Sequence, residues 1–310
     1  MIINRNEQRE RKQNVTNPIG IISMQFARPF GREHMHLFEH IRTLGFDLVE
    51  LLVPEREDGL DLKALRAALD EAGLGVALAA RVNLQRSISD ADRGIREGGM
   101  GYLRYCLEVA HALGATSVGG PLYGAPMVFA GRAPTPVAEE EMKARAARVI
   151  DGLGVLAPEA QAAGTKLALE PLNRYETDVI SLVSQAVTVV DAVNHPALGV
   201  LFDTFHANIE EKSIPDAIRL AGERIVYFQA NENNRGYPGT GHIDWHGTMQ
   251  ALADVGYTGP ITLEPFRRDD DERIGLPIAQ WRAPHEDESE QLKSAIAFVR
   301  DLIAKTGGRA

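Results

Sequence analysis

The sequence is poor in cysteine and in long apolar runs, and each shortage excludes whole classes of protein. Its one cysteine, Cys106, cannot form an internal disulfide or supply a zinc site that needs several cysteines. Cys106 stands between Tyr105 and Leu107 in a predicted helix, so we interpret it as a packing residue rather than a nucleophile. No apolar run approaches the ~20 residues of a membrane helix, so no membrane partner is expected.

Basic residues are also in the minority. Lys and Arg total 33 against 43 Asp and Glu, which gives a formal net charge of −10. An acidic surface repels phosphate backbones, so no nucleic-acid partner is expected. Residues 1–14 are polar and lack the apolar core of a signal peptide, and with the scarce cysteine they predict a cytoplasmic protein.

Eight short apolar segments recur along the chain, and helical patterns such as Leu62, Leu65 and Leu69 fill the gaps between them. Strands that alternate with helices predict a parallel sheet, and eight such units fit a single (β/α)8 TIM barrel of the α/β class. A doubly wound open sheet is the alternative, but no glycine-rich phosphate loop follows the first segment. The predicted strands are 19–24, 47–53, 75–80, 116–121, 166–171, 199–203, 225–230 and 260–265.

No linker or internal repeat divides the chain, so one domain is predicted. Residues 1–16 are expected to form a flexible N-terminal arm, since they are polar and precede the first strand. Residues 17–304 are predicted to form the (β/α)8 barrel, and residues 305–310 a C-terminal tail.

Polar side chains end four of the predicted strands. Glu170, Asp203 and Glu264 are carboxylates, and Gln229 is an amide. Active sites of such barrels lie at the carboxyl ends of the strands, so these groups are expected to converge. They could each begin an ordinary solvated loop, but three converging carboxylates favour a divalent cation. Oxygen ligands suit Mn²⁺ or Mg²⁺ better than zinc.

Four segments together resemble a known family. They are ALEPLNRYET (168–177), LFDTFHANIEE (201–211), NENNRGYPGTGHIDW (231–245) and GPITLEPF (259–266). They are similar to the xylose-isomerase-like TIM-barrel sugar isomerase/epimerase superfamily, most closely to its D-tagatose/D-psicose 3-epimerase branch. The similarity runs from the first predicted strand to the last helix.

The resemblance implies one divalent metal ion, with manganese (Mn²⁺) expected first and Mg²⁺ or Co²⁺ as alternatives. The implied ligands are Glu170, Asp203, Glu264 and Gln229, where Gln229 stands at the position of the family's histidine. An amide oxygen is a harder and weaker donor than imidazole, so this exchange should favour Mn²⁺ or Mg²⁺.

The resemblance also assigns roles toward a small-molecule sugar. Glu170 and Glu264 are implied as the catalytic pair that moves the proton. Glu176, His206 and Arg235 match residues that hold the carbonyl end of the sugar, and Phe266 matches a hydrophobic wall of the pocket.

The predicted reaction is epimerisation or isomerisation of a ketose or keto-sugar. A proton is removed from the carbon next to the carbonyl, a cis-enediolate forms, and the proton returns on the opposite face. The alternative is a lyase similar to C-glycoside deglycosidases, which would eliminate the aglycone of a 3-keto-glycoside and work with a small partner subunit. Two less favoured readings are an endonuclease IV-type repair enzyme and a non-catalytic barrel. The resemblance otherwise implies a homo-oligomer, a dimer or tetramer.

Overall fold

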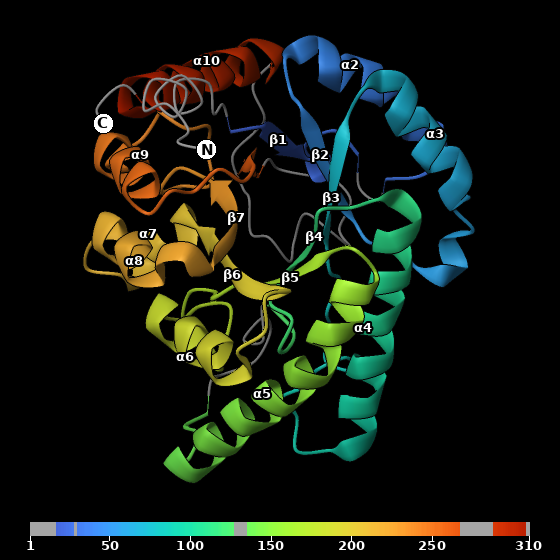
Figure 1. Ribbon diagram of the computed structural model, residues 1–310, viewed down its shortest axis with the longest axis vertical. Coiled ribbons are helices and arrows are strands. Elements are labelled where there is room, and N and C mark those ends of the chain that lie inside the picture. The colour runs from blue at the N-terminus through green and yellow to red at the C-terminus, as the bar shows by residue number, and fades with distance from the viewer. Residues whose placement is uncertain (1–16, 28–29, 127–134, 267–287, 308–310) are drawn as a thin grey trace, which may run out of the picture.

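A computed structural model describes residues 17–27, 30–126, 135–266 and 288–307. Within these residues eight parallel strands close into one barrel, because β1 pairs with β2 on one side and with β8 on the other (Figure 1). This closure confirms the predicted (β/α)8 barrel and rules out the open sheet. The strands are β1 (Ile19–Ile22), β2 (Leu48–Leu52), β3 (Gly75–Ala79), β4 (Ser117–Gly120), β5 (Lys166–Leu169), β6 (Leu198–Asp203), β7 (Ile225–Ala230) and β8 (Ile261–Leu263).

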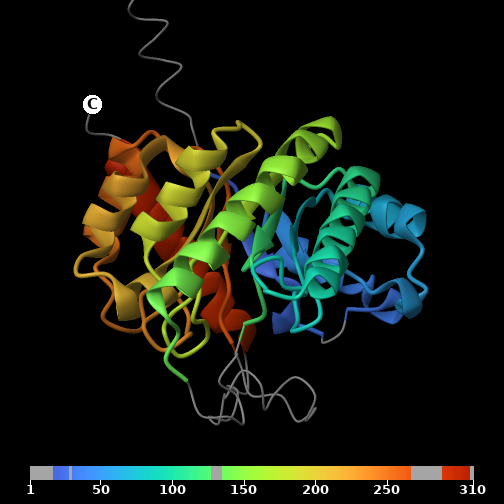
Figure 2. The same ribbon diagram turned by 90° about the horizontal axis from the view of Figure 1, so that it is seen from below.

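Helices surround the barrel, as the view from below also shows (Figure 2). They are α2 (Leu37–Leu44), α3 (Leu62–Ala72), α4 (Arg93–Leu113), α5 (Glu139–Ala162), α6 (Val183–Val193), α7 (Thr204–Glu210), α8 (Ile214–Ala221), α9 (Trp245–Asp254) and α10 (Glu288–Gly307). Short 3-10 turns are η1 (Ser23–Gln25), η2 (Arg32–His34), η3 (Arg56–Asp58) and η4 (Gly222–Arg224).

Helix α3 illustrates how local sequence sets these elements. The Asp61 side chain accepts hydrogen bonds from the backbone N–H groups of the next turn and so begins the helix. Leu65 and Leu69 lie on one face and are fully buried against the barrel. Gly73 ends the helix at a φ of 66°, a left-handed conformation that glycine adopts without a Cβ clash.

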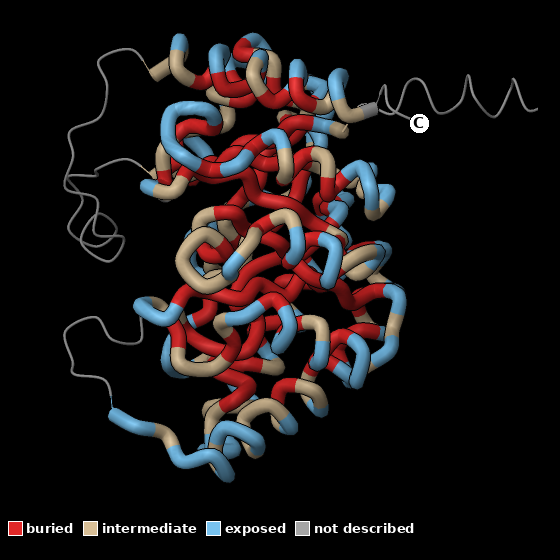
Figure 3. The backbone as a smooth tube through the Cα atoms, turned by 90° about the vertical axis from the view of Figure 1, so that its left-hand side faces the viewer, coloured by how far each residue is buried: buried red, intermediate tan, exposed pale blue. Residues whose placement is uncertain are grey.

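The core has two parts, and the second one positions the site. Most buried residues lie between the helices and the strands, while outward helix turns are exposed (Figure 3). Inside the barrel a separate cluster contains Leu48, Ala77, Ala168, Leu201 and Tyr227. Alternate residues of a strand point to the same face, so the side chains two positions further along these strands also point inward. Those positions include Glu50, Glu170, Asp203 and Gln229.

The predicted domain limits meet the structure only in part. Residues 1–16, the predicted arm, lie outside the described residues, as do 308–310. Helix α10 continues to Gly307, three residues beyond the predicted end of the barrel. The Thr306 hydroxyl donates to the carbonyl of Leu302 at 3.1 Å and so belongs to this helix.

Two further expectations concern the buried cysteine and the absence of membrane helices. Cys106 is fully buried in α4, and burial raises the pKa of its thiol to about 12, as expected for a packing residue. Among the described residues, no helix is long and apolar enough to cross a membrane.

Candidate active site

A cavity of about 440 Å³ opens at the carboxyl ends of the strands, and the predicted site residues gather around it. Its polar wall comes from the ends of β5 to β8 and the loops that follow them. The first four strands contribute apolar residues such as Ile22 and Leu52, together with the buried Glu50. The predicted residues that line the cavity are Glu170, Glu176, His206, Gln229, Arg235, Glu264 and Phe266, and Asp203 contacts this group through Arg235.

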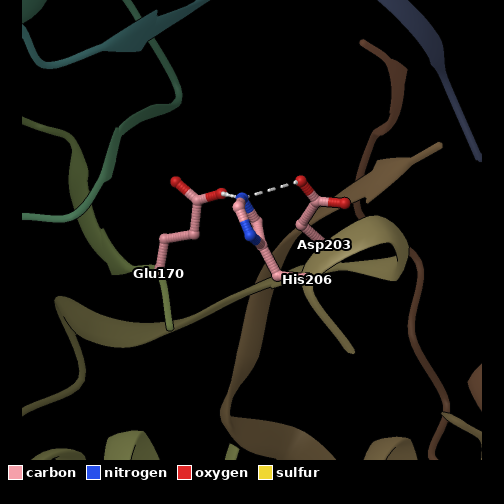
Figure 4. A group of neighbouring side chains, drawn as sticks. All are labelled: Glu170, Asp203 and His206. Carbon is pink, nitrogen blue, oxygen red and sulfur yellow. Dashed lines mark ion pairs between the residues drawn. The ribbon is translucent and has the colours of Figure 1, made fainter. Parts of the chain in front are cut away.

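Three side chains at the strand ends form a compact group (Figure 4). Ligand-type atoms of Glu170, Asp203 and His206 all lie within 4.8 Å of one another, and all three residues are buried. His206 Nε2 is 3.5 Å from Glu170 Oε1 and 3.5 Å from Asp203 Oδ2. Asp203 also begins α7, because its Oδ1 accepts a hydrogen bond from the backbone N–H of Phe205 at 2.7 Å. This cap places His206 in the first turn of the helix, facing the carboxylates.

The hydrogen bonds of His206 define what it presents to the cavity. Its Nδ1 lies 3.0 Å from the backbone N–H of Asn173, and its Nε2 lies 2.9 Å from Arg235 Nη2, which can only donate. Burial, reinforced by nearby Arg235, lowers the pKa of His206, which keeps the ring neutral. With Asn173 against one ring nitrogen and Arg235 against the other, neither nitrogen presents a free lone pair to a metal ion. The geometry therefore favours substrate binding over metal binding for His206.

Arg235 supplies the positive charge in the carboxylate cluster. Its Nη1 donates to Asp203 Oδ2 at 2.5 Å and to Glu264 Oε2 at 2.8 Å. The guanidinium lies between two aromatic rings, 4.3 Å from the centre of Phe205 and 4.5 Å from that of Phe266. Its φ of 58° is unusual for a residue with a Cβ, and such strain is typical of functional sites. The predicted wall residue Phe266 thus also stacks on the arginine.

We expect Arg235→Lys to lower kcat/KM by about 10–100-fold, since lysine keeps the charge but loses the forked donors and the stacking. Steady-state kinetics with the best ketose substrate would measure the loss. The matched control is Arg224→Lys, because Arg224 forms an exposed pair with Asp191 outside the cavity. A value of kcat/KM within twofold of the wild type in folded Arg235→Lys protein would contradict this role.

The remaining carboxyls are only partly compensated. Burial raises the pKa of Glu264 to about 8, although Arg235 opposes the shift. Burial and the negative charges of Glu264 and Asp203 also raise the pKa of Glu170 well above its usual range. Burial alone would raise the pKa of Asp203, but Arg235, His206 and Asn231 outweigh it and lower that pKa. An acidic cluster of this kind is stabilised by a further cation.

Two buried amide oxygens support the same conclusion. Gln229 Oε1 and Asn231 Oδ1 have no hydrogen-bond partner, although buried polar atoms are nearly always paired. The Asn231 Nδ2 group donates to Asp203 Oδ1 at 2.9 Å and to Glu264 Oε2 at 3.4 Å. Unpaired oxygens beside buried carboxylates are the ligands that hard divalent cations prefer, so the residues present fit a divalent metal ion.

These pKa shifts predict how the stability of the metal-free protein depends on pH. Glu170 and Glu264 hold their protons in the folded state at a pH where the unfolded chain has released them. Their stabilising effect is therefore lost as the pH rises through the folded pKa. The pKa of His206 is lowered, so the folded state favours its neutral ring. Below the unfolded pKa of 6.5, this group therefore makes the free energy of unfolding rise with pH.

From about pH 6.5 to 8.5 we expect the free energy of unfolding of chelator-treated protein to fall by about 2 kcal/mol from Glu264 alone, and further from Glu170. Urea unfolding at several pH values would measure it. A free energy that stays constant or rises over this range would contradict the assigned shifts.

Sequence reasoning missed two buried site residues, Glu50 and Asn231. Glu50 is 1% exposed and lies in the middle of β2, an otherwise apolar strand. A charged residue inside an apolar strand is costly to bury, and that cost was a usable signal. Asn231 gave no comparable signal, because an amide after a strand is typical of an ordinary loop.

The chain matches the family model described as a xylose isomerase-like TIM barrel over residues 38–302. It is 31% identical over 274 residues to a D-psicose 3-epimerase of Agrobacterium fabrum, covering 86% of this chain and 92% of that protein. It is 32% identical over 267 residues to a ketose 3-epimerase of Arthrobacter globiformis, covering 84% of this chain and 88% of that protein.

Solved structures are similar over nearly the whole chain. An L-ribulose 3-epimerase superposes with a TM-score of 0.84 at 28% identity, covering 94% of this chain and 96% of that one. A D-psicose 3-epimerase crystallised in the presence of D-fructose gives a TM-score of 0.83 at 28% identity. The match covers 93% of this chain and 99% of that one. These relatives are epimerases, so the comparisons favour the epimerase prediction over the lyase alternative.

Proposed function

Because the chain belongs to the xylose isomerase-like TIM-barrel family, we propose that it is a metal-dependent ketose 3-epimerase. The observation that carries this proposal is the pair of buried carboxyls Glu170 and Glu264, which follow β5 and β8 and line one cavity. Two other strands separate β5 from β8 in the barrel order, so the two carboxyls enter the cavity from different sides. An epimerase needs such an arrangement, because a proton leaves one face of a carbon and returns on the other.

In this mechanism Glu170 and Glu264 exchange the roles of base and acid according to the direction of the reaction. Burial raises the pKa of both carboxyls, and a bound cation would lower the pKa of each again, so that one could be ionised while the other holds its proton. One carboxylate takes the proton beside the carbonyl, which leaves a cis-enediolate, and the other carboxyl delivers a proton from the opposite side.

Neighbouring side chains hold the sugar during the transfer. The His206 ring and the Arg235 guanidinium line the cavity in contact with each other, and they would bind oxygens at the carbonyl end of the sugar. Glu176 is held by the Asn173 Nδ2 group, which donates to its Oε1 at 2.9 Å, and it would accept from a sugar hydroxyl. Phe266 would cover the sugar on its apolar side.

Glu170, Asp203, Gln229 and Glu264 would hold the metal ion, for which Mn²⁺ is our first choice and Mg²⁺ or Co²⁺ the alternatives. All four offer oxygen ligands, and the unpaired Gln229 Oε1 supports its place among them. When bound, a divalent cation supplies Lewis-acid polarisation of the sugar carbonyl. A cytoplasmic location and assembly into a homodimer or homotetramer stay predictions from the sequence, and light scattering after gel filtration would measure the assembly.

A panel of free ketoses tests the proposal. Mn²⁺-loaded protein is incubated with D-fructose, D-psicose, D-tagatose and L-ribulose in D₂O, and products are separated and examined by NMR. We expect the C3 epimer of at least one ketose, with deuterium at C3. Folded, metal-loaded protein that produces no C3 epimer from any of them would overturn the proposed function.

A further inference from the structure

We propose that Glu50 is a positioning residue that holds the Gln229 amide with its oxygen directed to the metal site. This inference rests on the proposed function, because it concerns the metal ion that the function requires. Glu50 lies on β2 and Gln229 on β7, on non-adjacent strands of the barrel and 179 positions apart in sequence. Their contact therefore crosses the barrel interior, at the level just past its apolar cluster.

The hydrogen bonds define the orientation of the amide. Gln229 Nε2 lies 3.0 Å from Glu50 Oε1 and 3.3 Å from Oε2. In its ionised form Glu50 only accepts hydrogen bonds, so it faces the NH₂ side of the amide. Burial raises the pKa of Glu50 to about 7, and the hydrogen bonds from Tyr227 and Gln229 oppose that shift. Gln229 Oε1 consequently points away from Glu50, and it is the atom that is buried without a partner. A glutamine without this neighbour could present either its oxygen or its nitrogen to the cavity.

Glu50 is itself anchored. The Tyr227 hydroxyl, two residues before Gln229 on the same face of β7, donates to Glu50 Oε2 at 2.9 Å. That hydroxyl also lies 2.6 Å from Thr262 Oγ1 on β8, so three strands hold the carboxylate in one place. Burial of an acid at 1% exposure is costly, and orienting a ligand explains why the barrel retains one here.

An isosteric change separates this role from mere packing. In Glu50→Gln the new NH₂ group can donate to Gln229 Oε1, which allows the Gln229 amide to turn and present its nitrogen to the site. An amide nitrogen has no lone pair to offer a cation. At the same time the variant removes a buried charge, so the metal-free fold should keep or gain stability.

The experiment measures Mn²⁺ binding to chelator-stripped protein by EPR, with melting temperature as a second readout. We expect Glu50→Gln to weaken Mn²⁺ binding about 10–100-fold without lowering the melting temperature of the metal-free protein. Gln229→Leu should weaken binding by a similar factor, and the double variant should bind no worse than Gln229→Leu alone. Glu71→Gln serves as the control, because Glu71 is exposed on α3 and lies outside the cavity, so Mn²⁺ binding should not change.

The outcomes distinguish this inference from the proposed function. Unchanged Mn²⁺ affinity in Glu50→Gln, or losses that add in the double variant, would overturn the positioning role while leaving the epimerase proposal intact. If the wild type binds Mn²⁺ and the variants weaken binding as expected, but no ketose is epimerised, only the proposed function would be overturned. Wild-type protein that binds no Mn²⁺ would overturn both.

Discussion

Glu264→Gln is expected to lower kcat for ketose epimerisation by about 10²–10⁴-fold. Glutamine keeps the shape of the side chain and one oxygen, which can still accept from Arg235 and serve the cation. It cannot exchange a proton near neutral pH, so the loss falls on the transfer step rather than on binding. KM is expected to change much less than kcat.

The variant must be shown to be folded and metal-loaded, by circular dichroism and by metal analysis. Glu71→Gln is the matched control, because Glu71 is exposed on α3 and lies outside the cavity. Loss of deuterium from a C3-labelled ketose gives a second readout of proton removal. Turnover at the wild-type rate in folded, metal-loaded Glu264→Gln protein would refute its assignment to the catalytic pair.

Removal of divalent metal is expected to abolish epimerisation, with a decrease in kcat of at least about 10³-fold on treatment with a chelator. The physical reason is the uncompensated negative charge in the site. Glu170 and Glu264 are both buried, and Arg235 is the neighbouring cation that opposes the raised pKa of each. Without a second cation these carboxyls hold protons, and they cannot act as bases at neutral pH.

Adding Mn²⁺ back should restore activity and stabilise the fold. At a free concentration of 100 times Kd the free energy of unfolding should rise by about 2.7 kcal/mol. Mg²⁺ and Co²⁺ provide the comparison for metal preference. Full activity in protein in which elemental analysis detects no metal would contradict the metal requirement.

The barrel and the position of its site were accessible from the sequence because both depend on local patterns. The predicted strands 199–203 and 225–230 are short apolar runs followed by polar loops, and the structure has β6 (Leu198–Asp203) and β7 (Ile225–Ala230) there. A polar residue at the carboxyl end of such a run lies at the rim of a parallel barrel, whatever the position of its strand in the barrel order. Glu170 and Glu264 were therefore found without knowledge of their neighbours, although their roles stay predictions.

Other features depend on which residues meet across the barrel. The sequence alone determined the strands, the helices and the rim that carries Glu170, Asp203 and Glu264, because periodicity acts within a few residues. The tertiary structure decided that Glu50 faces Gln229, that Arg235 contacts His206 Nε2 and that Arg235 lies between Phe205 and Phe266. The physical reason is that hydrogen-bond direction and ring stacking depend on strand register and barrel closure, which join residues far apart in the chain.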